Sequence, residues 1–219
     1  ILYGEEETVN DFWVSLVPYA ATVNVGGAHT AWLAAYDPGD YLPPLWEGAT
    51  NYATDDFASF NNLPFQALQP NLGAQPDINP GDWQPLTAIG WKGRVEARTA
   101  PFDQADTLPT TQPFVHQYWS TTIPVYTPQT GDNDWDWANI NEANGAQNNG
   151  LGPNLGCGPS ITPLVAEKTT VRDAIDEMQP WHRGGTMANL GLAWGWRVLS
   201  PTWQGLWGGA TPSELPLDY

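Results

Sequence analysis

Asp132, Asp134 and Asp136 are the residues whose type and spacing come nearest to a metal-binding loop. Calcium loops place oxygen ligands at alternate positions, because alternate side chains of a turning backbone point toward one centre. The sixth position of such a loop is normally glycine and the twelfth is glutamate, whereas Trp137 and Ala143 stand there. A solvated acidic loop is therefore the preferred interpretation, with a Ca²⁺ site as the alternative.

The other residues capable of metal binding or nucleophilic attack form no recognisable motif. His29, His116 and His182 are scattered, and none lies in a His-x-x-x-His or His-Glu-x-x-His pattern that would predict zinc. Cys157 is the one cysteine, so no disulfide can form within the chain. Neither a Gly-x-Ser-x-Gly elbow nor a Gly-x-x-x-x-Gly-Lys loop occurs. We therefore predict that the chain is not an enzyme.

The net charge of the chain limits the classes of molecule that we expect it to bind. Its 219 residues include 7 Lys plus Arg and 24 Asp plus Glu, a formal net charge of −17. Such a surface repels phosphate backbones and anionic lipids, which argues against nucleic acid as a partner. Cations, basic proteins and neutral glycans remain as candidate partners. No stretch approaches the roughly 20 apolar residues of a membrane span, so no transmembrane segment is predicted.

The composition indicates an ordered chain with many loops. The 21 Pro and 22 Gly interrupt long helices. The 13 Trp supply apolar area that disordered chains lack. We expect most of these rings to hold loops onto a scaffold. The alternative is that some of them line a sugar-binding groove.

Predicted strands are short and few. Residues 13–17 form a β-branched and aromatic run, which residues 22–25 continue. Residues 91–98 and 114–126 are the other two candidates. Residues 28–90 are punctuated by proline and show little periodicity, so we expect irregular structure there, and the polar segment 131–159 is expected to be a surface loop.

Two helices are predicted near the end of the chain. The first covers residues 167–178, with Thr169 or Thr170 as its N-terminal cap. Its apolar residues recur at helical spacing: Val171, Ala174, Ile175 and Met178. The second covers residues 187–199 and ends before Pro201. Its apolar positions are Leu190, Ala193, Trp194 and Val198.

Residues 172–201, RDAIDEMQPWHRGGTMANLGLAWGWRVLSP, resemble the C-terminal half of the von Willebrand A-type domain of tight-adherence (Tad/Flp) pilus-assembly proteins. The similarity extends, in the order of that family, to residues 13–26, 91–98, 153–157 and 161–164. Each segment alone is a weak signal, but together, and with the unusual GLAWGWRVLSP, they are specific.

The resemblance implies an α/β fold, namely a partial Rossmann-like A-type domain. In this interpretation one domain spans residues 1–219. Residues 1–27 and 160–203 supply its core, and residues 28–159 form a long insertion rich in Pro, Gly and Trp. The implied function is a non-catalytic interaction or adhesion module, periplasmic or extracellular, whose partner is a pilus or envelope protein. Two alternatives remain, a carbohydrate-binding or carbohydrate-active protein and a structural subunit of a membrane-associated complex.

The resemblance also implies an ion site. The family combines an Asp-x-Ser-x-Ser loop, a threonine and a third-loop aspartate around Mg²⁺ or Ca²⁺. Thr186 stands at the threonine position, while the first loop would precede Ile1 and the third would follow Tyr219. We therefore favour Thr186 as a helix cap over Thr186 as a metal ligand. Arg94 stands where the family often has a cysteine, which would pair with the equivalent of Cys157.

Overall fold

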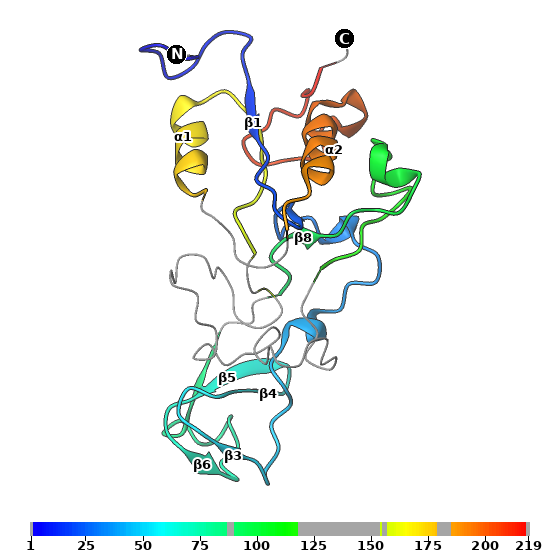
Figure 1. The fold of residues 1–219 in the computed structure, drawn as a ribbon. Coiled ribbons are helices and arrows are strands. Elements are labelled where there is room, and N and C mark those ends of the chain that lie inside the picture. The colour runs from blue at the N-terminus through cyan, green and yellow to red at the C-terminus, as the bar shows by residue number, and fades with distance from the viewer. Residues whose placement is uncertain (1, 87–89, 118–153, 155–156, 179–184, 218–219) are drawn as a thin grey trace. The chain divides into compact units, whose positions relative to one another are not determined.

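The structure is a computed structural model, and its described residues form two compact units (Figure 1). The described residues are 2–86, 90–117, 154, 157–178 and 185–217. The first unit comprises residues 1–36, 93–117 and 157–219. The second unit comprises residues 37–92 and 118–156.

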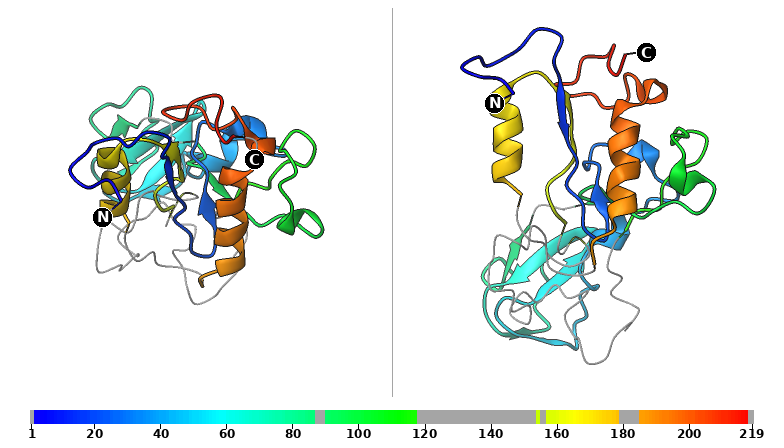
Figure 2. Two further views of the ribbon diagram at one scale, coloured as in Figure 1. Left: turned by 90° about the horizontal axis from the view of Figure 1, so that it is seen from above. Right: turned by 45° about the horizontal axis from the view of Figure 1, so that its top comes forward.

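Two short antiparallel ladders and two helices build the first unit. Strand β1 (Val14–Leu16) pairs with β9 (Thr162–Val165), and β2 (Val23–Asn24) pairs with β8 (Arg94–Val95). The β1–β9 ladder lies between the two helices, as both views show (Figures 1 and 2). The helices are α1 (Lys168–Asp176) and α2 (Ala188–Leu199). Short 3₁₀ helices complete the unit: η1 (Thr30–Trp32), η3 (Phe102–Gln104) and η7 (Pro201–Trp203).

The predicted Rossmann-like A-type fold is wrong. Among the described residues every sheet has two or three strands, and each pair of named strands is antiparallel. Parallel sheets are covered by helices on both faces, so their strands are continuous, buried apolar runs. Strand β1 has three residues, all of them half-buried, and Pro18 follows it closely. Such a strand is too short and too exposed for the centre of a parallel sheet.

The second unit contains a hairpin in a segment that we predicted to be irregular. Strands β4 (Phe57–Phe60) and β5 (Leu63–Ala67) pair antiparallel, with Phe60 opposite Leu63. The two residues between them, Asn61 and Asn62, have φ values of 50° and 60°. Two consecutive residues with positive φ make the tight turn whose twist suits a hairpin, and asparagine accepts that conformation readily.

Three more strands and a 3₁₀ helix complete the second unit. Strand β7 (Trp83–Pro85) pairs with β5. Strands β3 (Asn51–Tyr52) and β6 (Asn71–Leu72) form a separate ladder. The 3₁₀ helix η2 (Pro38–Tyr41) lies near the start of the unit.

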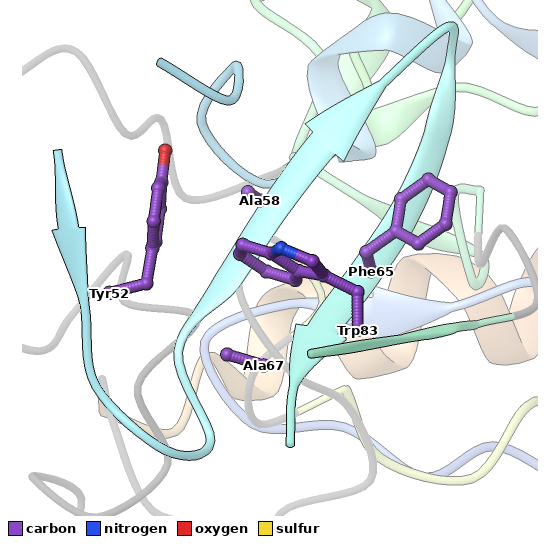
Figure 3. Close-up of a cluster of buried hydrophobic side chains, with 5 residues drawn as sticks. All are labelled: Tyr52, Ala58, Phe65, Ala67 and Trp83. Carbon is purple, nitrogen blue, oxygen red and sulfur yellow. The ribbon is translucent and has the colours of Figure 1, made fainter. Parts of the chain in front are cut away.

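A small aromatic core holds these strands (Figure 3). Its buried members are Tyr52, Ala58, Phe65, Ala67 and Trp83. The rings of Tyr52 and Trp83 meet edge to face at 4.9 Å. The indole of Trp83 donates to the Ala74 carbonyl at 2.8 Å, so its polar atom is satisfied inside the core.

Helix α1 confirms the first predicted helix, but its capping differs from the prediction. Glu167 occupies the N-cap position and makes no side-chain capping bond. Glu7 from the start of the chain caps the helix instead, because its carboxylate accepts from the Thr169 amide at 2.8 Å. The hydrogen bonds from Thr169 lower the pKa of Glu7. A cap supplied by a residue so distant in sequence is invisible to a local pattern search.

Candidate interaction surface

Helix α2, the second predicted helix, has an inner face that anchors the first unit. This inner face consists of the buried residues Leu190, Gly191, Trp194, Arg197 and Val198. Trp194 and Val198 are both 0% exposed. At about 100° per residue these positions share one side of the helix, which therefore faces the interior.

Aromatic rings surround Trp194 on this inner side. Its indole stacks on Phe114 at 4.8 Å and meets Trp203 edge to face at 5.7 Å. Trp207 stacks on Trp203 at 5.8 Å, and Trp32 meets Trp203 edge to face at 5.3 Å. The rings come from three widely separated stretches of sequence. These tryptophans hold loops together, as the composition predicted.

Arg197 ties the loop of η3 to α2 from inside the unit. It is 1% exposed, and its Nη2 donates to the carbonyls of Phe102 at 3.2 Å and Ala105 at 3.1 Å. Its guanidinium carbon lies 4.9 Å from the Trp194 ring centre. Burial lowers the pKa of Arg197 to about 10, against the opposing attraction of Asp106. Through Nε and Nη2, the arginine acts as a structural cross-link between α2 and this loop.

Buried arginines leave the surface of the described residues strongly acidic. Arg94, Arg98 and Arg197 are 5%, 8% and 1% exposed. Arg98 lies over the Phe114 ring at 3.6 Å, and burial lowers its pKa to about 10. None of the Asp and Glu residues that the structure describes is buried. Negative charge therefore meets the solvent while most of the arginine charge does not.

The opposite side of α2, here called the outer face, is apolar and exposed. Its exposed apolar members are Ala188, Leu192, Trp196 and Leu199, with the half-buried Gly195 at one edge and the exposed polar Asn189 at the other. Leu192 is 77% exposed, Leu199 56% and Trp196 44%. Their spacing of i, i+4 and i+7 aligns them in one row about 10 Å long. A row of large apolar side chains in water is typical of a surface that another molecule covers.

The two glycines of α2, Gly191 and Gly195, have different surroundings. A Cβ on Gly191 would lie 2.4 Å from the ring of Tyr19, so the inner glycine allows that ring to pack directly on the helix. A Cβ on Gly195 would meet nothing within 4 Å. The fold of the chain therefore requires a small residue at position 191 and makes no such demand at position 195.

The prediction that Thr186 caps α2 is wrong. Thr186 is exposed just before α2, and Met187 occupies the N-cap position without a side-chain capping bond. Its role as a metal ligand stays a prediction. Asp132, Asp134 and Asp136 lie outside the described residues. In the part of the chain that the structure describes, no cluster of three or more His, Cys, Asp and Glu residues is suited to a metal ion.

Cys157 is buried beside the β2–β8 ladder. It is 1% exposed, and the Asn24 amide donates to its Sγ at 3.3 Å and to the Gly158 carbonyl at 2.6 Å. The side-chain oxygen of Asn24 accepts from the Gly26 amide at 2.8 Å. Gly93 has a φ of 117°, and a Cβ there would lie 2.0 Å from the Asn24 side-chain oxygen. This thiol is therefore part of a tightly packed turn.

The two candidate histidines that the structure describes, His29 and His116, make separate aromatic contacts. His29 stacks on Trp32 at 3.9 Å, and burial lowers its pKa. His116 is buried and meets Tyr36 edge to face at 6.0 Å. His182 lies outside the described residues.

Sequence reasoning missed the outer face because it considered one apolar row in each helix. The signal was present, since α2 carries apolar residues on both of its sides.

No helix in the described ranges is both long and apolar enough to cross a bilayer. No family model, no curated protein and no solved structure matches this chain.

Proposed function

We propose that this chain is a non-catalytic protein-interaction module of the bacterial cell envelope, and that a protein partner covers the outer face of α2. The observation that carries this proposal is the exposure of Leu192, Trp196 and Leu199 in one row. Removing such side chains from water contributes on the order of 1.5–3 kcal/mol each when burial is complete. Three neighbouring side chains therefore offer a substantial driving force for association.

The resemblance of residues 172–201 to tight-adherence pilus-assembly proteins supports an envelope partner. It concerns the segment that contains α2. An acidic surface is also in keeping with a periplasmic or extracellular protein that must stay soluble. A pilus component or another envelope protein is the partner class that these features favour.

The carbohydrate-binding alternative has less support. Of the nine tryptophans that the structure describes, six are buried, and Trp196 alone is exposed. Stacking on sugars needs accessible ring faces, which buried indoles do not offer. A glycan array with the wild-type chain and Trp196→Ala tests this alternative, and strong binding that depends on Trp196 would favour it.

Photo-cross-linking in the cells that produce the chain tests the proposed function. Position 192 receives p-benzoylphenylalanine, and position 45 receives it in a matched control, because Leu45 is 71% exposed in the second unit. We expect a protein adduct from position 192 well above the adduct from position 45. An adduct from position 45 alone, or from neither position, would overturn the proposal.

A further inference from the structure

Arg98 is a buried arginine that uses only part of its hydrogen-bonding capacity. It is 8% exposed, and its Nη1 donates to the Thr107 carbonyl at 2.6 Å. Its Nε and Nη2 are shielded from solvent, and no residue that the structure describes accepts a hydrogen bond from either atom. A buried donor without an acceptor is costly, and more so when the donor is charged. Contacts within the described chain therefore leave one edge of this guanidinium unsatisfied.

The two unused donors lie side by side on that edge. In a planar guanidinium the N–H bonds of Nε and Nη2 point in the same direction, which is the geometry that binds both oxygens of a carboxylate. The edge is also fixed in position. The guanidinium carbon of Arg98 lies 3.6 Å from the centre of the Phe114 ring, and Thr107 holds the opposite end of the group. The edge is thus preorganised for a planar anion.

The charge of Arg98 is also left without compensation. Burial, with a smaller contribution from the charge of Arg197, lowers the pKa of Arg98 to about 10, so the group stays protonated at neutral pH. Burial lowers the pKa of Arg197 as well, but Asp106 and Asp103 oppose that effect. In the described part of the chain, these carboxylates therefore act on Arg197, whereas Arg98 experiences the repulsion of a second arginine.

We propose that the Nε–Nη2 edge of Arg98 binds a small monovalent carboxylate, of which formate is the simplest. The anion must be small because both donor atoms are shielded from solvent, and its entry must accompany local opening of the first unit. A single negative charge is favoured because the formal net charge of −17 repels multivalent anions more strongly. This site is separate from the outer face of α2 and does not depend on the proposed function.

Thermal unfolding of the purified full chain in formate and in chloride tests this inference. The two sodium salts are compared at about 100 mM in Tris buffer, so that ionic strength is equal. A ligand that binds the folded chain alone stabilises it, and we expect a midpoint about 2–4 °C higher in formate. Titration calorimetry of the wild-type chain with formate should show one site per chain.

Three variants assign the effect to the fork of Arg98. Arg98→Gln removes the charge, and Arg98→Lys keeps the charge but lacks the planar pair of donors. Both variants should have the same midpoint in formate as in chloride. Arg172→Gln is the matched control, because Arg172 is exposed on α1. That variant should keep the full difference between the two salts.

Several results would overturn the inference. Equal midpoints in formate and chloride for the wild-type chain, with no heat of binding, would mean that water or the buried Oδ1 of Asp103 satisfies Arg98. A formate effect that persists in Arg98→Lys, or that disappears in Arg172→Gln, would assign it to general salt effects. If Arg98→Gln fails to fold, Arg98→Lys and the wild-type calorimetry decide the question.

Discussion

The inner and outer faces of α2 place the same residue types in opposite surroundings. Trp194 is 0% exposed and stacked among aromatic rings, whereas Trp196 is 44% exposed. Gly191 lies under Tyr19, whereas Gly195 faces open space. Angular position on the helix, and not residue type, decides which member of each pair the fold uses. The outer members are thus free to serve another molecule.

The tryptophan pair should give the largest contrast in stability. Trp194→Ala removes a fully buried indole from the aromatic cluster, so we expect a loss of about 3–5 kcal/mol in the free energy of unfolding. Trp196→Ala should cost clearly less, because 44% of this residue already lies in solvent. Urea denaturation followed by circular dichroism measures both. Similar losses for the two variants would remove the distinction between the faces.

Substitution of the two glycines by alanine should change the free energy of unfolding in opposite directions. Gly191→Ala forces the Tyr19 ring away from the helix, and we expect a loss of about 1–3 kcal/mol. Gly195→Ala meets no atom and improves helix propensity, so a gain of up to about 1 kcal/mol is expected. Denaturation midpoints of the two variants provide the measurement. Destabilisation by Gly195→Ala would mean that the fold itself needs this glycine.

Ser200, at the C-terminal end of α2, gives a smaller and pH-dependent effect. Its hydroxyl donates to the Asp106 carboxylate, and this bond is the main reason that the pKa of Asp106 is lowered. A lowered carboxylate pKa stabilises the fold above the unfolded value of 3.8, and this contribution is lost as the pH falls through the folded pKa. Ser200→Ala should therefore cost about 1 kcal/mol at pH 7.

The same variant should approach wild-type stability in acid. Urea titrations at pH 7 and below pH 3 measure the difference between the two proteins. A difference that stays constant over this range would assign the effect of Ser200 to packing and not to the carboxylate.

Local patterns predicted the parts of the fold that local forces determine. The apolar spacing of residues 167–178 and 187–199 correctly predicted α1 and α2, and residues 13–17 contain β1. The hairpin at Asn61-Asn62 was missed, although two asparagines between apolar runs are a turn signal.

Contacts between residues that are distant in the sequence could not be predicted from local patterns. Glu7 caps a helix that begins more than 150 residues later, and Arg197 bonds to carbonyls around Phe102. Neither of these contacts can be predicted from the spacing of residues in the sequence. The Rossmann-like fold was inferred from a resemblance of segments, which carries no information on how the strands pair. The outer face of α2 required knowledge of which side of the helix the rest of the chain covers.

Leu192→Asp tests most directly whether the outer face serves a partner and not the fold. Because Leu192 is 77% exposed, we expect the free energy of unfolding to change by no more than about 0.5 kcal/mol. In the same protein, cross-linking from p-benzoylphenylalanine at position 196 should fall to the level of the position 45 control. Unchanged stability with loss of the adduct is the predicted result. A cross-link that persists despite the introduced carboxylate, or a large loss of stability, would contradict the account.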